Sequence, residues 1–126
     1  MVVSGMYVRL SNAVKRRFEA LQEPRIDIED IREVVDGHLR QAREVAEAGG
    51  PVDIALAEDL HRTCMALLAS EKLNETDYRL VQAGCLYFAD DEDDDGDFTS
   101  RTGLADDVDV INYVCASVGR PDLAVR

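Results

Sequence analysis

The sequence predicts an all-α fold, a single-domain bundle of about five helices with an acidic loop between the last two. Apolar residues recur at spacings of three and four along most of the chain, which is the pattern of amphipathic helices. No alternating strand pattern extends over four residues. At 126 residues, 46% of them hydrophobic, the chain can bury one core despite a net charge of −12. We therefore expect one domain over residues 1–126.

The first two helices are delimited by recognisable end signals. The first is expected over residues 5–22, because Pro24 prevents its continuation. The second begins at Asp27, whose side chain can cap the first turn, and Gly49 and Gly50 end it. The expected core face of the second helix is Ile28, Ile31, Val34 or Val35, Leu39, Ala42 and Val45. On its exposed side we expect the ion pairs Asp36–Arg40 and Arg43–Glu47, with His38 at the surface or boundary.

The third and fourth helices are expected over residues 52–69 and from Asn74 onwards. Pro51 suits the first turn of the third helix, and Asn74 is a capping residue for the fourth. Residues 80–89 are apolar nearly all round except for Gln82, which places the fourth helix at the centre of the bundle. Gly84 in this helix allows a neighbouring helix to approach closely.

The last helix is expected over residues 104–118, with Gly119 as its stop signal. Asp106 and Asp107 lie in its first turn, where negative charge complements the helix dipole. Pro121 prevents continuation, and we expect residues 120–126 to be a short, extended or frayed tail.

No catalytic motif is present, and we expect the protein not to be an enzyme. Cys64, Cys85 and Cys115 each lie among apolar residues at helical spacing, which is typical of buried hydrophobes. His61 is one turn from Cys64, but the paired close spacings of a zinc site are absent. One Glu58-x-x-His61 pair falls short of the two such pairs in a diiron bundle.

The acidic loop, residues 90–103, opens the segment DDEDDDGDFTSRTGLADD. Asp91, Asp93 and Asp95, followed by Gly96, fit the first half of an EF-hand calcium loop. Position twelve of that loop is Thr102, so the bidentate carboxylate is missing. Weak Ca²⁺ or Mg²⁺ ligands are therefore a hypothesis for Asp91, Asp93, Asp95 and Asp97. A solvated loop without a metal ion is the favoured interpretation, and no other cofactor is expected.

The segment of residues 80–114 has an apolar helix ending in LYF, a loop with DF, and a Gly-Leu-x-Asp-Asp start to the next helix. The positions concerned are Tyr87, Phe88, Asp97, Phe98, Gly103, Leu104, Asp106, Asp107 and Val110. This pattern resembles the YkvA-like family of small helical proteins of unknown function. The resemblance implies a turn at Gly103, with Asp106 and Asp107 holding the loop or the helix start, and it implies no particular activity.

Three functions remain open. The favoured one is a non-enzymatic helical protein-interaction or regulatory module, because apolar residues such as Val110 and Val114 fall on more than one face of the last helix. Such a module would bind a protein partner or form a homodimer. The second is an acidic mimic or inhibitor, antitoxin-like or immunity-like, of a basic partner. The third is a divalent-cation-dependent regulator that uses the acidic residues of 91–107.

Charge and hydropathy narrow the location and the partners. The net charge of −12 disfavours direct nucleic-acid binding. The only basic cluster in the sequence, residues 15–17, is typical of the solvated face of a helix. No run of eighteen apolar residues predicts a membrane span, and no signal-peptide layout is seen, so we expect a cytoplasmic location. The Asp-rich, lysine-poor composition is also typical of a high-GC genome or a salt-loving organism, which would explain the acidity without a function.

Overall fold

The computed structural model describes residues 10–71, 73–89 and 104–125. These residues form five α-helices and one short 3-10 helix, with no strand among them, which confirms the all-α prediction. The elements are α2 (Asn12–Ala20), α3 (Ile28–Glu47), α4 (Ile54–Leu68), α5 (Glu75–Ala89), α6 (Ala105–Ser117) and the 3-10 helix η1 (Pro121–Leu123).

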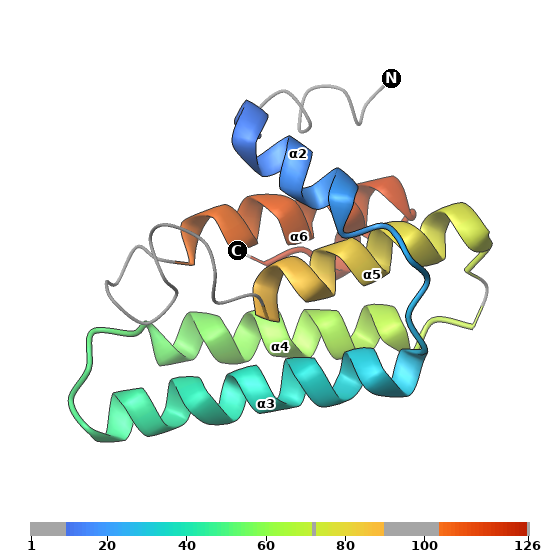
Figure 1. The fold of residues 1–126 in the computed structure, drawn as a ribbon. Coiled ribbons are helices and arrows are strands. Elements are labelled where there is room, and N and C mark those ends of the chain that lie inside the picture. The colour runs from blue at the N-terminus through green and yellow to red at the C-terminus, as the bar shows by residue number, and fades with distance from the viewer. Residues whose placement is uncertain (1–9, 72, 90–103, 126) are drawn as a thin grey trace.

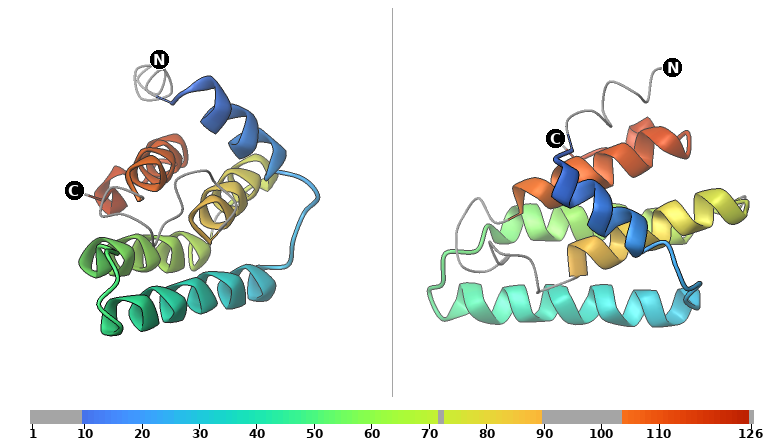
Figure 2. Two further views of the ribbon diagram at one scale, coloured as in Figure 1. Left: turned by 60° about the vertical axis from the view of Figure 1, so that its left-hand side comes forward. Right: turned by 45° about the horizontal axis from the view of Figure 1, so that its top comes forward.

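Four of the helices form an up-and-down bundle, and the fifth crosses it. Successive helices from α3 to α6 run in alternating directions, so that α3 lies beside α4 and α5 beside α6 (Figure 1). Helix α5 contacts each of the other four α-helices, as expected for a helix whose residues 80–89 are apolar nearly all round. Helix α2 lies obliquely over α5 on the side of the bundle away from α3 (Figure 2).

The helix starts differ from the predicted ones where a nearby side chain can cap the first turn. The first helix does not include residues 10 and 11, because the Ser11 hydroxyl accepts a hydrogen bond from the Val14 N–H at 3.2 Å and caps α2. Residues 5–9 lie outside the described part of the chain. The carboxylate of Asp53 caps α4 in the same way, so Pro51 precedes the helix instead of opening it.

Two further start signals, Asn74 and Asp27, mark the observed starts of α5 and α3, but only Asn74 caps its helix through the side chain. Asn74 caps α5 as predicted, because its side-chain oxygen accepts from the Asp77 N–H at 2.8 Å. Asp27 occupies the capping position of α3 with extended backbone, but its side chain makes no capping hydrogen bond. At the other end of α3, Gly49 adopts a φ of 84°, the left-handed conformation that stops a helix.

The core is one cluster at the centre of the bundle. Helix α3 contributes Ile31, Val35, Leu39 and Ala42, which resolves the choice between neighbouring valines in favour of Val35. Gly84 of α5 faces α6, where a Cβ atom would lie 2.9 Å from a methyl carbon of Val114. The predicted close approach of a helix at Gly84 is therefore confirmed.

The expectation that apolar residues of the last helix are left over for an interface is wrong for Val110 and Val114. Val110 and Val114 are both completely buried, together with Ile111 and Cys115. Both valines point inwards because α6 contacts α5 on one side and α4 on the other. Helix α6 therefore presents no spare apolar face through these residues.

The C-terminal segment is docked instead of frayed. After η1, the side chain of Asn112 holds Val125 by two hydrogen bonds, 2.7 Å from its N–H and 2.9 Å to its carbonyl oxygen. The Thr63 hydroxyl donates to the Leu123 carbonyl at 2.9 Å. Val125 is buried, so the chain folds back over α4 and α6 after Gly119, which has the left-handed φ of 77°.

Candidate functional site

The predicted metal ligands belong to the acidic loop, residues 90–103, which the structure does not describe. Asp91, Asp93, Asp95 and Asp97, and also Gly103, lie outside the described residues, and their roles stay predictions. Asp106 and Asp107 lie in the first turn of α6 as predicted. Asp106 is exposed, whereas Asp107 is completely buried, which the sequence did not indicate.

His38 lies differently from the prediction, and His61 takes part in a contact between helices. His38 was expected at the surface or boundary, but it is buried, because its ring packs edge-on against Phe88 with centroids 4.8 Å apart. His61 bonds Asp36 across the α3–α4 interface, with 2.7 Å between Nε2 and Oδ1. Glu58 of α4 likewise pairs with Arg43 of α3, with 3.3 Å between Oε2 and Nη2.

These contacts replace the expected ion pairs within α3. Asp36 bonds His61 instead of Arg40, and Arg43 pairs with Glu58 instead of Glu47. Within the described ranges, no group of three or more His, Cys, Asp or Glu side chains is arranged to hold a metal ion.

The three cysteines are buried thiols in the core, as predicted. They come from three helices, and the Cys85 thiol lies 3.9 Å from the backbone oxygen of Cys64. The pKa of Cys64 is raised well above its usual value, mainly by a hydrogen bond with the Cys85 thiol and next by burial. Burial raises the pKa of Cys115 to about 12. A nucleophilic thiol needs a lowered pKa and access, so these thiols are poorly suited to catalysis.

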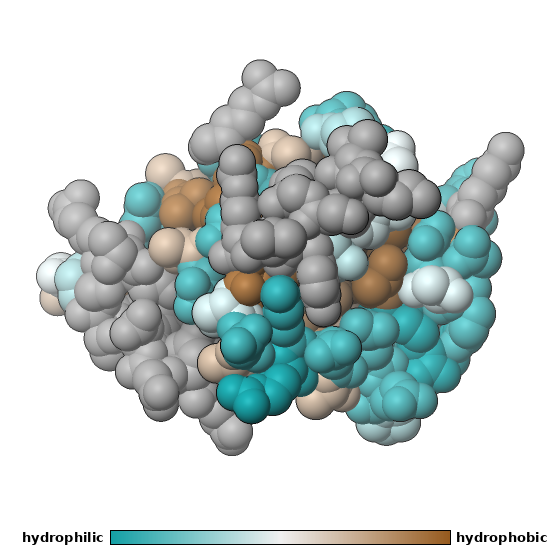
Figure 3. Space-filling view, turned by 90° about the horizontal axis from the view of Figure 1, so that it is seen from above, coloured by the Kyte–Doolittle hydropathy of each residue, from teal (hydrophilic) through white to brown (hydrophobic). Residues whose placement is uncertain are grey.

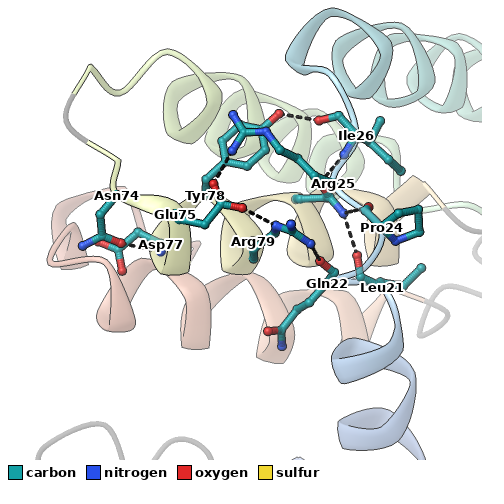
Figure 4. Close-up of polar contacts among 11 residues, drawn as sticks. Leu21, Gln22, Pro24, Arg25, Ile26, Asn74, Glu75, Asp77, Tyr78 and Arg79 are labelled. Carbon is teal, nitrogen blue, oxygen red and sulfur yellow. Dashed lines mark hydrogen bonds and ion pairs between the residues drawn. The ribbon is translucent and has the colours of Figure 1, made fainter.

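The most elaborate polar arrangement surrounds the linker of residues 21–27, between α2 and α3. It crosses the first half of α5, whose side chains bond its backbone (Figure 4). The Tyr78 hydroxyl donates to the Ile26 carbonyl at 2.5 Å, and Arg79 donates to the Gln22 carbonyl at 2.8 Å. Glu75 binds both Arg79 and Arg25, and the Arg25 guanidinium lies 4.1 Å from the Tyr78 ring centre.

Gln82 completes the attachment of the linker. Its amide nitrogen donates to the carbonyls of Leu21 at 3.0 Å and Pro24 at 2.8 Å, and its oxygen accepts from the Ile26 N–H at 2.8 Å. The side chain is completely buried, and a buried amide is stable only when its donors and acceptors are paired. Gln82 thus fixes three backbone groups of a segment more than fifty residues away in sequence. The sequence showed Gln82 only as the single polar position among the apolar residues 80–89.

An acidic surface accompanies the fixed linker. Apart from Glu29, which pairs with Arg32, the exposed carboxylates of the end of α2, the linker and the start of α3 form what we call the acidic strip: Glu19, Glu23, Asp27, Asp30 and Glu33. No ion pair joins any of these five side chains to another described residue. Both arginines of residues 19–33 are already engaged, Arg25 with Glu75 and Arg32 with Glu29. The acidic strip therefore keeps its negative charge.

A groove lies at one end of the acidic strip. It has a volume of about 270 Å³ and is lined by Glu19, Gln22, Glu23, Glu75, Thr76 and Arg79. The hydrogen bond from Arg79 and the charges of Arg25 and Arg79 lower the pKa of Glu75, so this carboxylate is ionised at neutral pH. Glu19 lies in the last turn of α2, where the helix dipole is also negative. The groove suits a cationic group better than an anionic or a neutral one.

Comparisons with known proteins add no relative. The chain matches no protein-family model, and the curated proteins and solved structures likewise gave no match. The resemblance to the YkvA-like family stays a prediction. In the described residues, none of the helices has the length and apolar character needed to cross a membrane.

Proposed function

We propose that this protein is a non-enzymatic helical module that binds another protein, and that the acidic strip contacts a basic surface of that partner. The observation that carries the proposal is the combination of a rigidly attached linker with exposed carboxylates that have no ion pair inside the described chain. Preorganised charges lose little conformational entropy on binding, so they favour association more than charges on a loose loop do.

The buried polar contacts support binding over catalysis. Glutamine, tyrosine and arginine side chains of α5 are used to hold the linker in place, and none of them is free to act on a substrate. The three thiols are enclosed in the core. The linker is thus built to present its surface in one conformation.

The sign of the charge argues for a basic partner and against self-association through the acidic strip. Two copies would bring like charges together, which is unfavourable, whereas a basic partner is attracted and steered from a distance. The same contact would make the protein an acidic inhibitor if the partner's basic surface has another ligand. Divalent-cation binding by residues 91–107 remains a separate prediction.

The proposal can be tested with a synthetic peptide as the partner surrogate. A fluorescein-labelled amphipathic helix of lysine, leucine and alanine would be titrated with the full chain and followed by fluorescence anisotropy. The strip variant carries Glu19→Gln, Glu23→Gln and Glu33→Gln. Three exposed ion pairs at about 0.5 kcal/mol each give about 1.5 kcal/mol, so binding should weaken about tenfold.

A matched control separates the acidic strip from overall charge. The control variant carries Glu47→Gln, Glu71→Gln and Asp109→Asn, which removes the same number of exposed negative charges from other parts of the surface. It should bind the peptide within about twofold of the wild type. Equal losses in the strip and control variants would show that only net charge matters, and would refute the assignment of the acidic strip.

A further inference from the structure

The middle of α3 holds a glycine, Gly37, for which the described residues show no structural requirement. Gly37 lies near the centre of this 20-residue helix, where glycine is less stable than alanine because it loses more backbone freedom. A Cβ atom built at Gly37 would meet only the end of the Arg40 side chain, at 3.6 Å. Its backbone φ is not in the left-handed range, so no local geometry calls for glycine.

The other glycine inside a long helix shows the usual reason for such a residue. A Cβ atom at Gly84 would lie 2.9 Å from Val114 of α6, so its missing side chain lets two helices meet. Nothing described in the chain has this relation to Gly37. A glycine suited to a close helix contact is therefore present on a surface of α3 that contacts no other described helix.

Val34 marks the same outer surface of α3. Its side chain is 46% exposed and is the one large exposed hydrophobic residue among the described residues. It lies one turn before Gly37, while the adjacent Val35 fills the core position. In Figure 1, α3 is the lowest helix, and no described segment lies below it.

Charged side chains surround these two residues. Asp30, Glu33 and Glu44 are exposed on α3, and none has an ion pair with a described residue. Arg40 has a long, flexible side chain whose end lies over Gly37, and it can move aside without breaking an ion pair. Helix α3 as a whole carries six acidic residues and three arginines.

We propose that the outer face of α3, defined by Asp30, Glu33, Val34, Gly37 and Glu44, docks a basic amphipathic helix of a partner protein that crosses α3 at Gly37. The glycine permits the close approach, Val34 supplies an apolar contact, and the carboxylates select lysine and arginine on the incoming helix. A second copy of this chain would present the same acidic α3, so charge complementarity favours a different, basic protein. This inference rests on the proposed function and names its partner as helical.

The test replaces the glycine by a bulky residue that favours helix. Gly37→Leu should raise the urea midpoint of unfolding, because leucine has the higher helix propensity and the site is open. Loss of binding then cannot come from loss of folding. The control is Ala55→Leu, which adds comparable bulk at an exposed position of α4. The probe is the labelled lysine, leucine and alanine peptide, beside a version of equal charge whose helix is interrupted by proline.

We expect Gly37→Leu to weaken binding of the helical peptide about fivefold or more, because the added side chain overpacks a close contact. The affinity for the interrupted peptide should not change. Ala55→Leu should leave both unchanged. Equal affinities for Gly37→Leu and Ala55→Leu would overturn the docking face, even if the strip variant lost binding as the proposed function requires. If the wild type binds neither peptide, the proposed function itself fails. A dimer in light scattering that Gly37→Leu converts to a monomer would overturn the basic partner in favour of a second copy.

Discussion

Replacing Gln82 by leucine tests whether α5 fixes the linker of residues 21–27. Leucine fills similar space but makes no hydrogen bond, so the carbonyls of Leu21 and Pro24 and the N–H of Ile26 lose their partner. Each hydrogen bond contributes about 1 kcal/mol net to folding, which gives a loss of about 3 kcal/mol. We expect a melting temperature about 12 °C lower, at about 4 °C per kcal/mol for a chain of this size.

Urea denaturation followed by far-UV circular dichroism measures this loss directly. The midpoint should fall while the slope against urea stays the same, because the surface exposed on unfolding hardly changes. A destabilisation below about 1 kcal/mol would refute the reasoning, since it would mean that water replaces Gln82 at little cost.

Gln82→Glu gives an independent control through its pH dependence. A carboxylate would face the carbonyls of Leu21 and Pro24, so the neutral acid is favoured in the folded state and its folded pKa lies above the unfolded value of about 4.3. The variant should therefore be most stable below that unfolded pKa and should lose stability as pH rises through the folded pKa. A flat profile relative to the wild type would contradict the buried, carbonyl-facing geometry.

Three further outcomes follow from other parts of the structure. Gly84→Ala should destabilise the fold by about 1–3 kcal/mol in urea, and Val114→Ala in the same chain should restore part of this by removing the methyl group it meets. The folded pKa of Cys115 is about 12 and the unfolded pKa is about 8.5, so stability should fall as pH rises between these values, and native thiols should resist iodoacetamide until urea unfolds the chain. Arg79 lowers the pKa of Glu75, so the ionised carboxylate stabilises the fold at neutral pH and this stability is lost as pH falls through that pKa. Glu75→Gln removes this contribution, so the variant's stability should fall less steeply with acid than that of the wild type.

The sequence by itself determined the class of fold and most of the helix ends. Spacings of three and four, together with capping Asn74 and the stop residues Gly49 and Gly119, are local signals that act within one or two turns. The buried cysteines and the close helix contact at Gly84 also followed from apolar neighbours on the same helix.

Only the tertiary structure decided which polar groups meet. Asp36 binds His61 instead of the arginine four residues away, because α4 packs beside α3 and offers a partner across the interface. Gln82 holds a linker more than fifty residues away, and Asn112 holds Val125. Such contacts depend on the rotation and separation of packed helices, which no local spacing records. The acidic residues of the strip are visible in the sequence, but their lack of ion pairs and their fixed position are properties of the folded chain.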